Sequence, residues 1–261
     1  LLSEFLSPDV NTRSDAWGGS LANRALLLLE VVRAVRAAVG RDFPLSVKLN
    51  SADFQRGGFT HEEAVTVARW LDDGGVDALE LSGGTYEAPK MMTDAITLDA
   101  AKAEHLRAST IAREAYFLEY ARDIRAATRL PLLVTGGFRS VVGMNAALAS
   151  GATDLIGLGR PLCVAPDIAA RLLDGRAATC PAPEQTLRLG PTRWLGPASP
   201  LALVKLVNGM GAANWFMYQL LRLGRDGAAD PSLGLLRAFV ALQRNDRRAA
   251  RRLRRSTAPT V

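Results

Sequence analysis

The clearest chemical signals in the sequence are two places where a short apolar run ends in glycine. Leu130–Thr135 runs into Gly136–Gly137, and Thr153–Leu158 runs into Gly159–Arg160. Glycine lets the backbone approach a ligand closely, and a helix that follows directs its free N–H groups to the same place. An arginine can also donate two parallel hydrogen bonds to phosphate oxygens. The two junctions predict a phosphate-binding site, with ordinary tight turns as the alternative.

Lys48 is the second candidate, because it stands in the middle of an otherwise apolar run. Side chains alternate along a strand, so Ser46, Lys48 and Asn50 share one polar face. A buried lysine needs a partner or a ligand, and a cation on this face could stabilise an anion or an electron-rich ring. The alternative is an ion pair with an acid of an adjacent strand, for instance Glu80.

A polar segment, residues 11–24 (NTRSDAWGGSLANR), precedes the first long apolar pattern. It contains two arginines, one aspartate and two adjacent glycines, and Ser20 is a favoured type of helix N-cap. This composition indicates a loop held by its own charge-assisted hydrogen bonds. We therefore expect a structural role for the segment.

The elements that must position these residues alternate along the chain. Four short apolar runs, bounded by Gly, Pro or Asp, are typical of strands buried on both faces of a parallel sheet. They are Pro44–Asn50, Val76–Ser82, Leu130–Thr135 and Thr153–Leu158. Helical patterns cover Ser20–Val39, Thr60–Asp72 with a capping box of Thr60 and Glu63, Ser109–Ala127, Val141–Ser150 and Pro166–Leu173. Strict alternation predicts an α/β fold with right-handed crossovers.

The character of the sequence changes after about Arg176. Thr179–Pro200 is rich in Pro and Gly and is expected to be irregular, whereas Leu201–Leu223 is a long apolar helical run. The run is long enough to span a bilayer, but its polar residues scatter around the helix and would be costly in lipid. A helix packed on the protein is therefore favoured. Pro231–Arg255 is predicted to form a last, basic helix.

Composition excludes several classes of protein. The chain has 261 residues and is 48% apolar, which excludes disorder throughout. Two cysteines and two histidines cannot build a disulfide framework or a four-cysteine zinc site, so no metal is predicted.

The net charge of +6 comes from Arg237–Arg255, which has eight arginines and one acid. That tail is interpreted as a solvated helix end, with nucleic-acid or anionic-membrane binding as alternatives. No signal segment is visible, so a cytoplasmic location is expected.

Several motifs together resemble the old yellow enzyme family of FMN-dependent NAD(P)H:flavin oxidoreductases. The polar segment matches the family pattern N-x-R-x-D-x-x-G-G-S-x-x-N-R at every fixed position. The match continues in order through SVKLN, ELSGGTYE, REAYFLEYA, LLVTGGFRS and LIGLGRPL. It covers roughly residues 1–175, and the remainder resembles more loosely the C-terminal extension of one bacterial branch.

The resemblance implies a TIM (β/α)₈ barrel of which residues 1–175 supply strands five to eight, followed by a helical extension over residues 176–261. It implies FMN at the barrel mouth. Lys48 falls where the family has a basic residue, usually arginine, at the pyrimidine edge of the flavin, so we expect a tuned potential. Gly136, Gly137, Gly159 and Arg160 fall on the phosphate-binding positions.

The activity implied is hydride transfer from NAD(P)H through FMN to an activated alkene such as an enone. The family's substrate-anchoring His-x-x-Asn or His-x-x-His is absent, and His61 and His105 are interpreted as surface residues. We therefore assign no catalytic residue and expect a fragment that is inactive alone. The implied partner is a small-molecule acceptor, without nucleic acid or membrane, and homo-oligomerisation is left open.

Three other functions are the alternatives to this oxidoreductase. They are a non-catalytic FMN- or phosphate-binding half barrel that pairs with another chain, an unrelated phosphate-handling barrel, and a nucleic-acid-binding tail on an inert scaffold.

Overall fold

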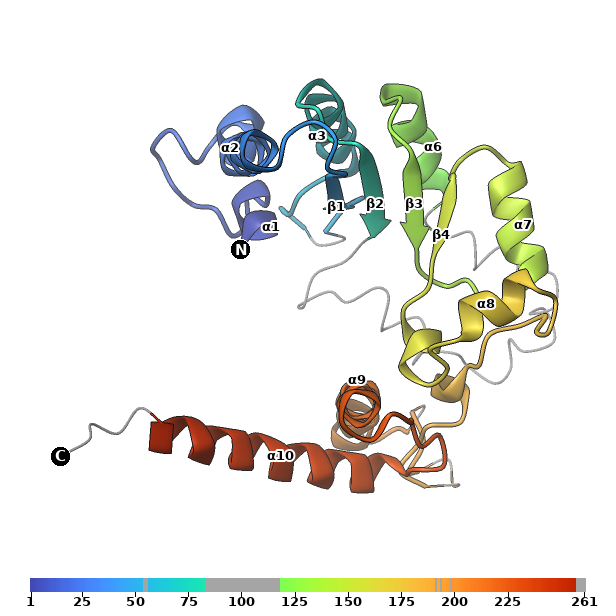
Figure 1. Cartoon of the computed structure of the whole chain (residues 1–261). Helices are drawn as coiled ribbons and strands as arrows, with labels where there is room; N and C mark the ends of the chain where they lie inside the picture. Colours follow the sequence, from blue (N-terminus) through green and yellow to red (C-terminus); the bar gives the residue numbers. More distant parts are fainter. Residues whose placement is uncertain (54–55, 83–117, 191, 193, 198, 257–261) are drawn as a thin grey trace. The chain divides into compact units, whose positions relative to one another are not determined.

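The computed structural model describes residues 1–53, 56–82, 118–190, 192, 194–197 and 199–256. These residues belong to two compact units, which divide between Leu158 and Gly159. The first unit carries the sheet and the second is helical (Figure 1). The domain boundary near residue 175 expected from the sequence stays a prediction.

The first unit is built on four parallel strands in the order β1-β2-β3-β4. They are β1 (Ser46–Asn50), β2 (Ala78–Ser82), β3 (Leu132–Thr135) and β4 (Leu155–Gly157). The four predicted strands are confirmed, each shorter than its apolar run. The register sets Lys48 beside Glu80 and Thr135 beside Gly157, so the chain leaves β3 and β4 at the same edge of the sheet.

Helices separate the strands along the chain and pack against them. α3 contacts β1, α6 contacts β3 and α7 contacts β4. Ser20 caps α2, and Thr60 with Glu63 forms the predicted capping box of α3. No sequence pattern indicated the short α1, and residues 109–117 of one expected helix lie outside the described residues. The helices of this unit are α1 (Leu2–Leu6), α2 (Leu21–Val39), α3 (His61–Asp73), α6 (Leu118–Ala127) and α7 (Val141–Ala149).

The two faces of the sheet differ in burial. Leu79, Leu81 and Leu132 are fully buried beneath the helices, whereas Lys48 and Glu80 on the opposite face keep 56% and 31% of their side chains exposed. The expectation of strands buried on both faces is therefore wrong for the described residues. The physical reason is that a barrel interior is filled in layers by side chains from all of its strands, and four strands supply only part of each layer.

The polar segment before α2 is tied down as expected. Asn11 donates to the carbonyls of Phe5 and Trp17, both at 2.8 Å. The Arg24 guanidinium, only 4% exposed, donates to the carbonyls of Leu6 and Gly19 and pairs with Glu63 of α3. Arg24 thus joins α1, the loop, α2 and α3, which confirms a structural role.

The second unit has its own core around α9 and α10. Trp215 is fully buried with Phe216, Leu235 and Ala238, and the Trp215 Nε1–H donates to the Leu233 carbonyl at 2.6 Å. The segment after β4 packs on α9 as well. The elements of this unit are η2 (Arg160–Cys163), α8 (Ile168–Leu173), η3 (Pro183–Gln185), α9 (Ala202–Asp226) and α10 (Leu235–Ser256).

Two polar residues of α9 correct the sequence interpretation. Asn208 and Gln219 were expected on scattered sides, but both are buried on the same side as Trp215. Asn208 accepts from the Leu189 N–H at 3.0 Å, and Gln219 exchanges two hydrogen bonds with the backbone of Asp230. Each polar group therefore has a partner in the packed interface. Among the described residues, no helix is long and apolar enough to cross a membrane.

Candidate functional site

A row of polar side chains crosses the less buried face of the sheet. The Lys48 Nζ lies 2.8 Å from the Glu80 Oε1, and the Thr135 hydroxyl donates to the same oxygen at 2.8 Å. Lys48 was expected to be buried, but its side chain is 56% exposed. The ion pair with Glu80, the alternative interpretation of the sequence, is present. Contact between Lys48 and a flavin stays a prediction.

Glu80 is ionised by its surroundings. Partial burial alone would raise the pKa of this carboxyl, but hydrogen bonds from Lys48 and Thr135 and the charge of Lys48 outweigh burial and hold the pKa below its ordinary value. Glu80 therefore fixes the ammonium of Lys48 at a defined place on the sheet. The sequence indicated Glu80 only as a partner for Lys48, and Thr135 was not singled out at all.

Gly157 completes the row at β4. A Cβ built at Gly157 would stand 1.8 Å from the Thr135 Oγ1 and 2.7 Å from its Cβ. The Thr135 side chain therefore occupies the space that any other residue at 157 would need. Gly157 was also missed by the sequence reasoning, because only the strand pairing reveals which side chain it faces.

The first glycine junction follows β3 directly. Gly136 and Gly137 have φ angles of 139° and 80°, a region that favours glycine because a Cβ would clash with the backbone. After buried Phe138, Ser140 caps α7 by accepting from the Gly143 N–H at 3.0 Å. The junction is thus a glycine turn that leads into a helix N-terminus, the arrangement that suits an anion.

The second junction follows β4 and opens the helical unit. Gly159 has a φ of −110°, which any residue can adopt, and a Cβ at this position would meet nothing within 4 Å. Open space beside the backbone is what a phosphate group requires. Arg160 begins η2, and its Nη1 lies 3.8 Å from the Glu184 Oε1. The backbone and the guanidinium present here fit a phosphate, and binding by these residues stays a prediction.

His61 differs from its expected surface position. Its side chain is only 18% exposed, its Nε2 lies 2.8 Å from the Asp123 Oδ2, and its ring meets Tyr120 edge-on at 4.8 Å. His61 thus fastens α3 to α6. His105 lies outside the described residues. Among the described residues, no cluster of His, Cys, Asp or Glu could hold a metal ion.

Comparison with known proteins decides the family. Residues 1–179 match the NADH:flavin oxidoreductase / NADH oxidase family. The chain belongs to this family. An NADH-dependent flavin oxidoreductase of Neonectria sp. (strain DH2) is 40% identical over 167 residues, which are 64% of the chain and 21% of that protein. One from Talaromyces variabilis is 39% identical over 167 residues, again 64% of the chain and 39% of that protein.

Solved structures agree on the fold of this family member. A 2-naphthoyl-CoA reductase in complex with 2-naphthoyl-CoA matches with a TM-score of 0.59 and 28% identity, over 80% of the chain and 30% of that protein. The resemblance to old yellow enzymes and the partial TIM barrel are therefore confirmed. The chain spans between about a fifth and two fifths of the length of the two curated relatives named above.

Proposed function

We propose that this chain carries the C-terminal half of the FMN-binding barrel, with a helical extension, of an oxidoreductase that transfers hydride from NAD(P)H through FMN to an activated alkene such as an enone. The observation that carries the proposal is the in-order family match over residues 1–179, with its two glycine junctions after the paired strands β3 and β4. Relatives named as NADH-dependent flavin oxidoreductases support a flavin and a nicotinamide reductant. When bound, FMN would supply the hydride transfer between reductant and acceptor.

The residues of the chain would hold the flavin rather than the acceptor. In this proposal the backbone at Gly136, Gly137 and Gly159 and the guanidinium of Arg160 bind the phosphate. Lys48 presents a positive charge to the electron-rich ring and favours its anionic reduced form. Glu80 and Thr135 orient Lys48. None of these side chains donates a proton to the acceptor, and no residue of the described ranges is assigned that role.

The less buried sheet face supports the view that further barrel units are needed for turnover. β1 is an outer strand of the described sheet, and a groove of about 260 Å³ lies beside it. Leu6 of α1, Val32 of α2 and Leu49 of β1 are among its lining residues. An apolar groove at an unpaired strand edge suits another strand with its own apolar side chains. We propose that the chain alone binds flavin weakly and is catalytically inactive.

The same groove favours a second candidate function. The chain would act as a non-catalytic FMN-binding half barrel that another polypeptide completes. A purified complex of the two polypeptides with a flavin absorption band but no NAD(P)H oxidation would support this candidate over the first.

The phosphate assignment has a direct test. In the longest natural polypeptide that contains this chain, Arg160→Ala should weaken FMN binding by about 10- to 150-fold, the equivalent of about 1.5–3 kcal/mol for a hydrogen bond to a charged group. Binding of riboflavin, which lacks the phosphate, should stay unchanged. Arg171→Ala on α8 is the matched control, because that arginine is 41% exposed and not part of the junction. Equal losses for FMN and riboflavin, or none for FMN, would exclude the assignment.

A further inference from the structure

Helix α10 has one packed side and one basic side. Leu235 and Ala238 pack with Trp215 of α9, and buried Leu242 follows them on the same side. Four arginines recur at steps of seven, four and three residues, which keep them within a sector of about 60° on the far side of the helix. We name them the α10 stripe, and all four are exposed. Its members are Arg237, Arg244, Arg248 and Arg251.

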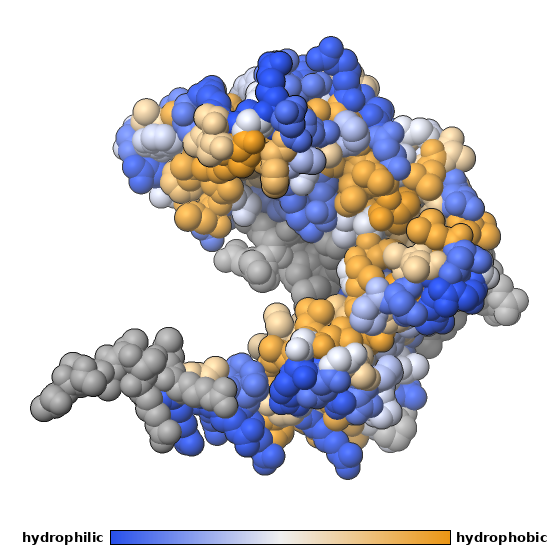
Figure 2. Space-filling view, viewed as in Figure 1, coloured by the Kyte–Doolittle hydropathy of each residue, from blue (hydrophilic) through white to orange (hydrophobic). Residues whose placement is uncertain are grey.

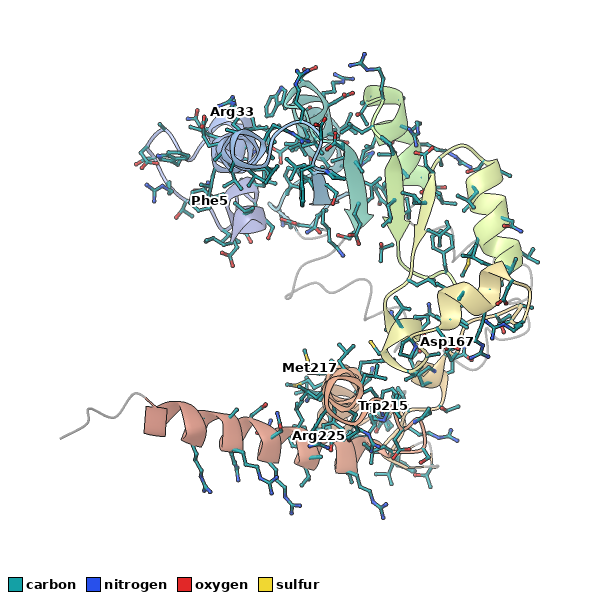
Figure 3. All side chains as sticks on the ribbon, viewed as in Figure 1. Phe5, Arg33, Asp167, Trp215, Met217 and Arg225 are labelled. Atoms are coloured by element: carbon teal, nitrogen blue, oxygen red, sulfur yellow. The ribbon has the colours of Figure 1, made fainter. Side chains whose placement is uncertain are left out.

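The stripe concentrates positive charge on one surface. Figure 3 shows nitrogen-tipped side chains extending from one side of α10, and Figure 2 shows hydrophilic residues along that side. At 1.5 Å per residue the four arginines span about 21 Å. Asp246 is the one acid in the sequence of α10. It stands two residues from both Arg244 and Arg248, a spacing at which helical side chains do not face each other.

The stripe arginines have no acidic partner. None of the four forms an ion pair with another residue that the structure describes. Elsewhere in the second unit, by contrast, Arg176 has the Asp174 carboxylate 2.6 Å away. Arg222 likewise lies 3.4 Å from the Asp230 carboxylate. A cationic surface without carboxylates of its own favours an anionic ligand.

Mutual repulsion adds to this preference. Arg244 and Arg248 stand four residues apart, a spacing at which like charges destabilise a helix. Arg247 and Arg251 repeat the same spacing. Residues 246–251 are all exposed, so no packed neighbour offsets the repulsion there. An anion along the stripe would neutralise these charges and stabilise the helix.

Double-stranded nucleic acid is the polyanion that suits this surface best. Its phosphates recur at short, regular intervals along each strand, and a guanidinium can donate two parallel hydrogen bonds to a phosphate. The major groove of a duplex is about 12 Å wide and admits an α-helix. Proteins hold single strands by stacking the bases on aromatic side chains, and residues 240–251 contain no aromatic residue.

A lipid surface suits the stripe less well. Helices that lie on a membrane bury large apolar side chains beside their basic residues. In α10 the exposed large apolar residues Leu236, Phe239 and Val240 all precede Leu242, where only one of the stripe arginines stands. From residue 243 to residue 251 the only apolar residues are two alanines. The basic part of the helix therefore suits contact with phosphates without insertion.

We propose that the α10 stripe binds the phosphate backbone of double-stranded nucleic acid without sequence preference. The proposal goes beyond the proposed function and is independent of flavin binding, because no stripe arginine belongs to the glycine junctions. It favours the nucleic-acid alternative left open by the sequence over a solvated helix end, and over the absence of nucleic acid implied by the family resemblance. Phosphate contacts position a protein on a duplex but carry no base specificity.

Neutral variants of the stripe test the proposal in the 261-residue chain and in the longest natural polypeptide that contains it. The probe is a fluorescently labelled DNA duplex, and anisotropy is measured with saturating FMN, so that a flavin site cannot bind the probe. The logarithm of the association constant should fall against the logarithm of the salt concentration with a slope of about −4, for four phosphate contacts. The triple variant Arg244→Gln, Arg248→Gln, Arg251→Gln should bring the slope to about −1 and weaken binding at least about 100-fold at about 0.1 M salt.

A control variant with the same loss of charge separates the stripe from net charge. Arg33→Gln, Arg129→Gln and Arg176→Gln together remove three arginines that are 61%, 90% and 64% exposed and lie outside α10. This variant should keep the salt slope and most of the affinity. Lysine at the three stripe positions keeps the charges and should also keep the slope, because counterion release depends on charge. Circular dichroism confirms that all variants are folded.

Four results would overturn the proposal. The first is no binding of the duplex at about 50 mM salt, where non-specific binding is strong. The second is an equal loss of affinity in the stripe variant and the control variant. The third is tighter binding of a single strand than of the duplex. The fourth is tighter binding to phosphatidylserine vesicles than to the duplex at the same phosphate concentration.

Discussion

Glu80 holds together the inner polar row of the sheet, because it accepts from both Lys48 and Thr135. Its pKa in the folded chain is held below the ordinary value, since these two donors outweigh the opposing effect of burial. The ionised carboxylate therefore stabilises the folded state above the pKa of an unfolded glutamate. That contribution disappears as the pH falls through the lower pKa of the folded state.

Removal of the Lys48 ammonium should raise the pKa of Glu80. In Lys48→Met the hydrogen bond and the charge are lost while burial remains, so the pKa of Glu80 should rise above its wild-type value. Carboxyl ¹³C chemical shifts, followed by NMR between about pH 3 and 7 in glutamate-labelled protein, measure this pKa. Lys205→Met, which replaces an exposed lysine of α9, should leave the pKa of Glu80 unchanged. An unaltered Glu80 titration in Lys48→Met would contradict the geometry of the pair.

Arg24 shows how one residue can fix several elements. Its buried guanidinium donates to the carbonyls of Leu6 and Gly19 and pairs with Glu63. Loss of the guanidinium therefore leaves these two carbonyls and the Glu63 carboxylate without this donor. Arg24→Met should lower the free energy of unfolding by about 3 kcal/mol, the lower end for a broken buried ion pair because Glu63 is 23% exposed.

A matched arginine on the same helix provides the control. Arg33 pairs with Glu30, and the two side chains are 61% and 47% exposed. Arg33→Met should therefore cost less than about 1 kcal/mol. Urea unfolding of both variants gives the comparison, and equal losses would refute the bracing role of Arg24.

The pairing of β3 with β4 depends on the absence of a side chain at Gly157. Gly157→Ala should destabilise the sheet by about 1–3 kcal/mol, because its Cβ would overlap the Thr135 side chain. In a Thr135→Ala background the penalty should shrink, although a Cβ contact remains. Gly224→Ala on α9 has open space and should not destabilise. Thermal unfolding of the four combinations at 135 and 157 tests the contact, and an unchanged penalty would exclude it.

Local patterns were predictable from the sequence, whereas burial was not. Ser20 and Thr60 act on backbone groups three residues away, so their caps can be read from the sequence. The exposure of Lys48 depends on strands that do not cover its face, and the partner of His61 is Asp123, 62 residues along the chain. The burial of Asn208 and Gln219 depends on backbone from other segments. Burial that depends on such distant partners cannot be predicted from the neighbouring residues in the sequence.

For the molecule as a whole, we propose that these residues supply the phosphate side of a flavin site and need further βα units for turnover. The family match over residues 1–179 and the share of each relative that is covered both support this proposal. The less buried face of the sheet supports it independently, because a complete barrel would fill that face with side chains from the remaining strands.

The most direct test compares the 261-residue chain with the longest natural polypeptide that contains it. Both are purified, incubated with FMN and desalted. Retained flavin and the oxidation of NADH and NADPH with cyclohexenone are then measured, with circular dichroism confirming that both are folded. The longer polypeptide should retain about one flavin per chain and reduce the enone, whereas the chain alone should show only the background rate of free FMN. Comparable turnover by the folded chain alone, or no flavin in the longer polypeptide, would contradict the account.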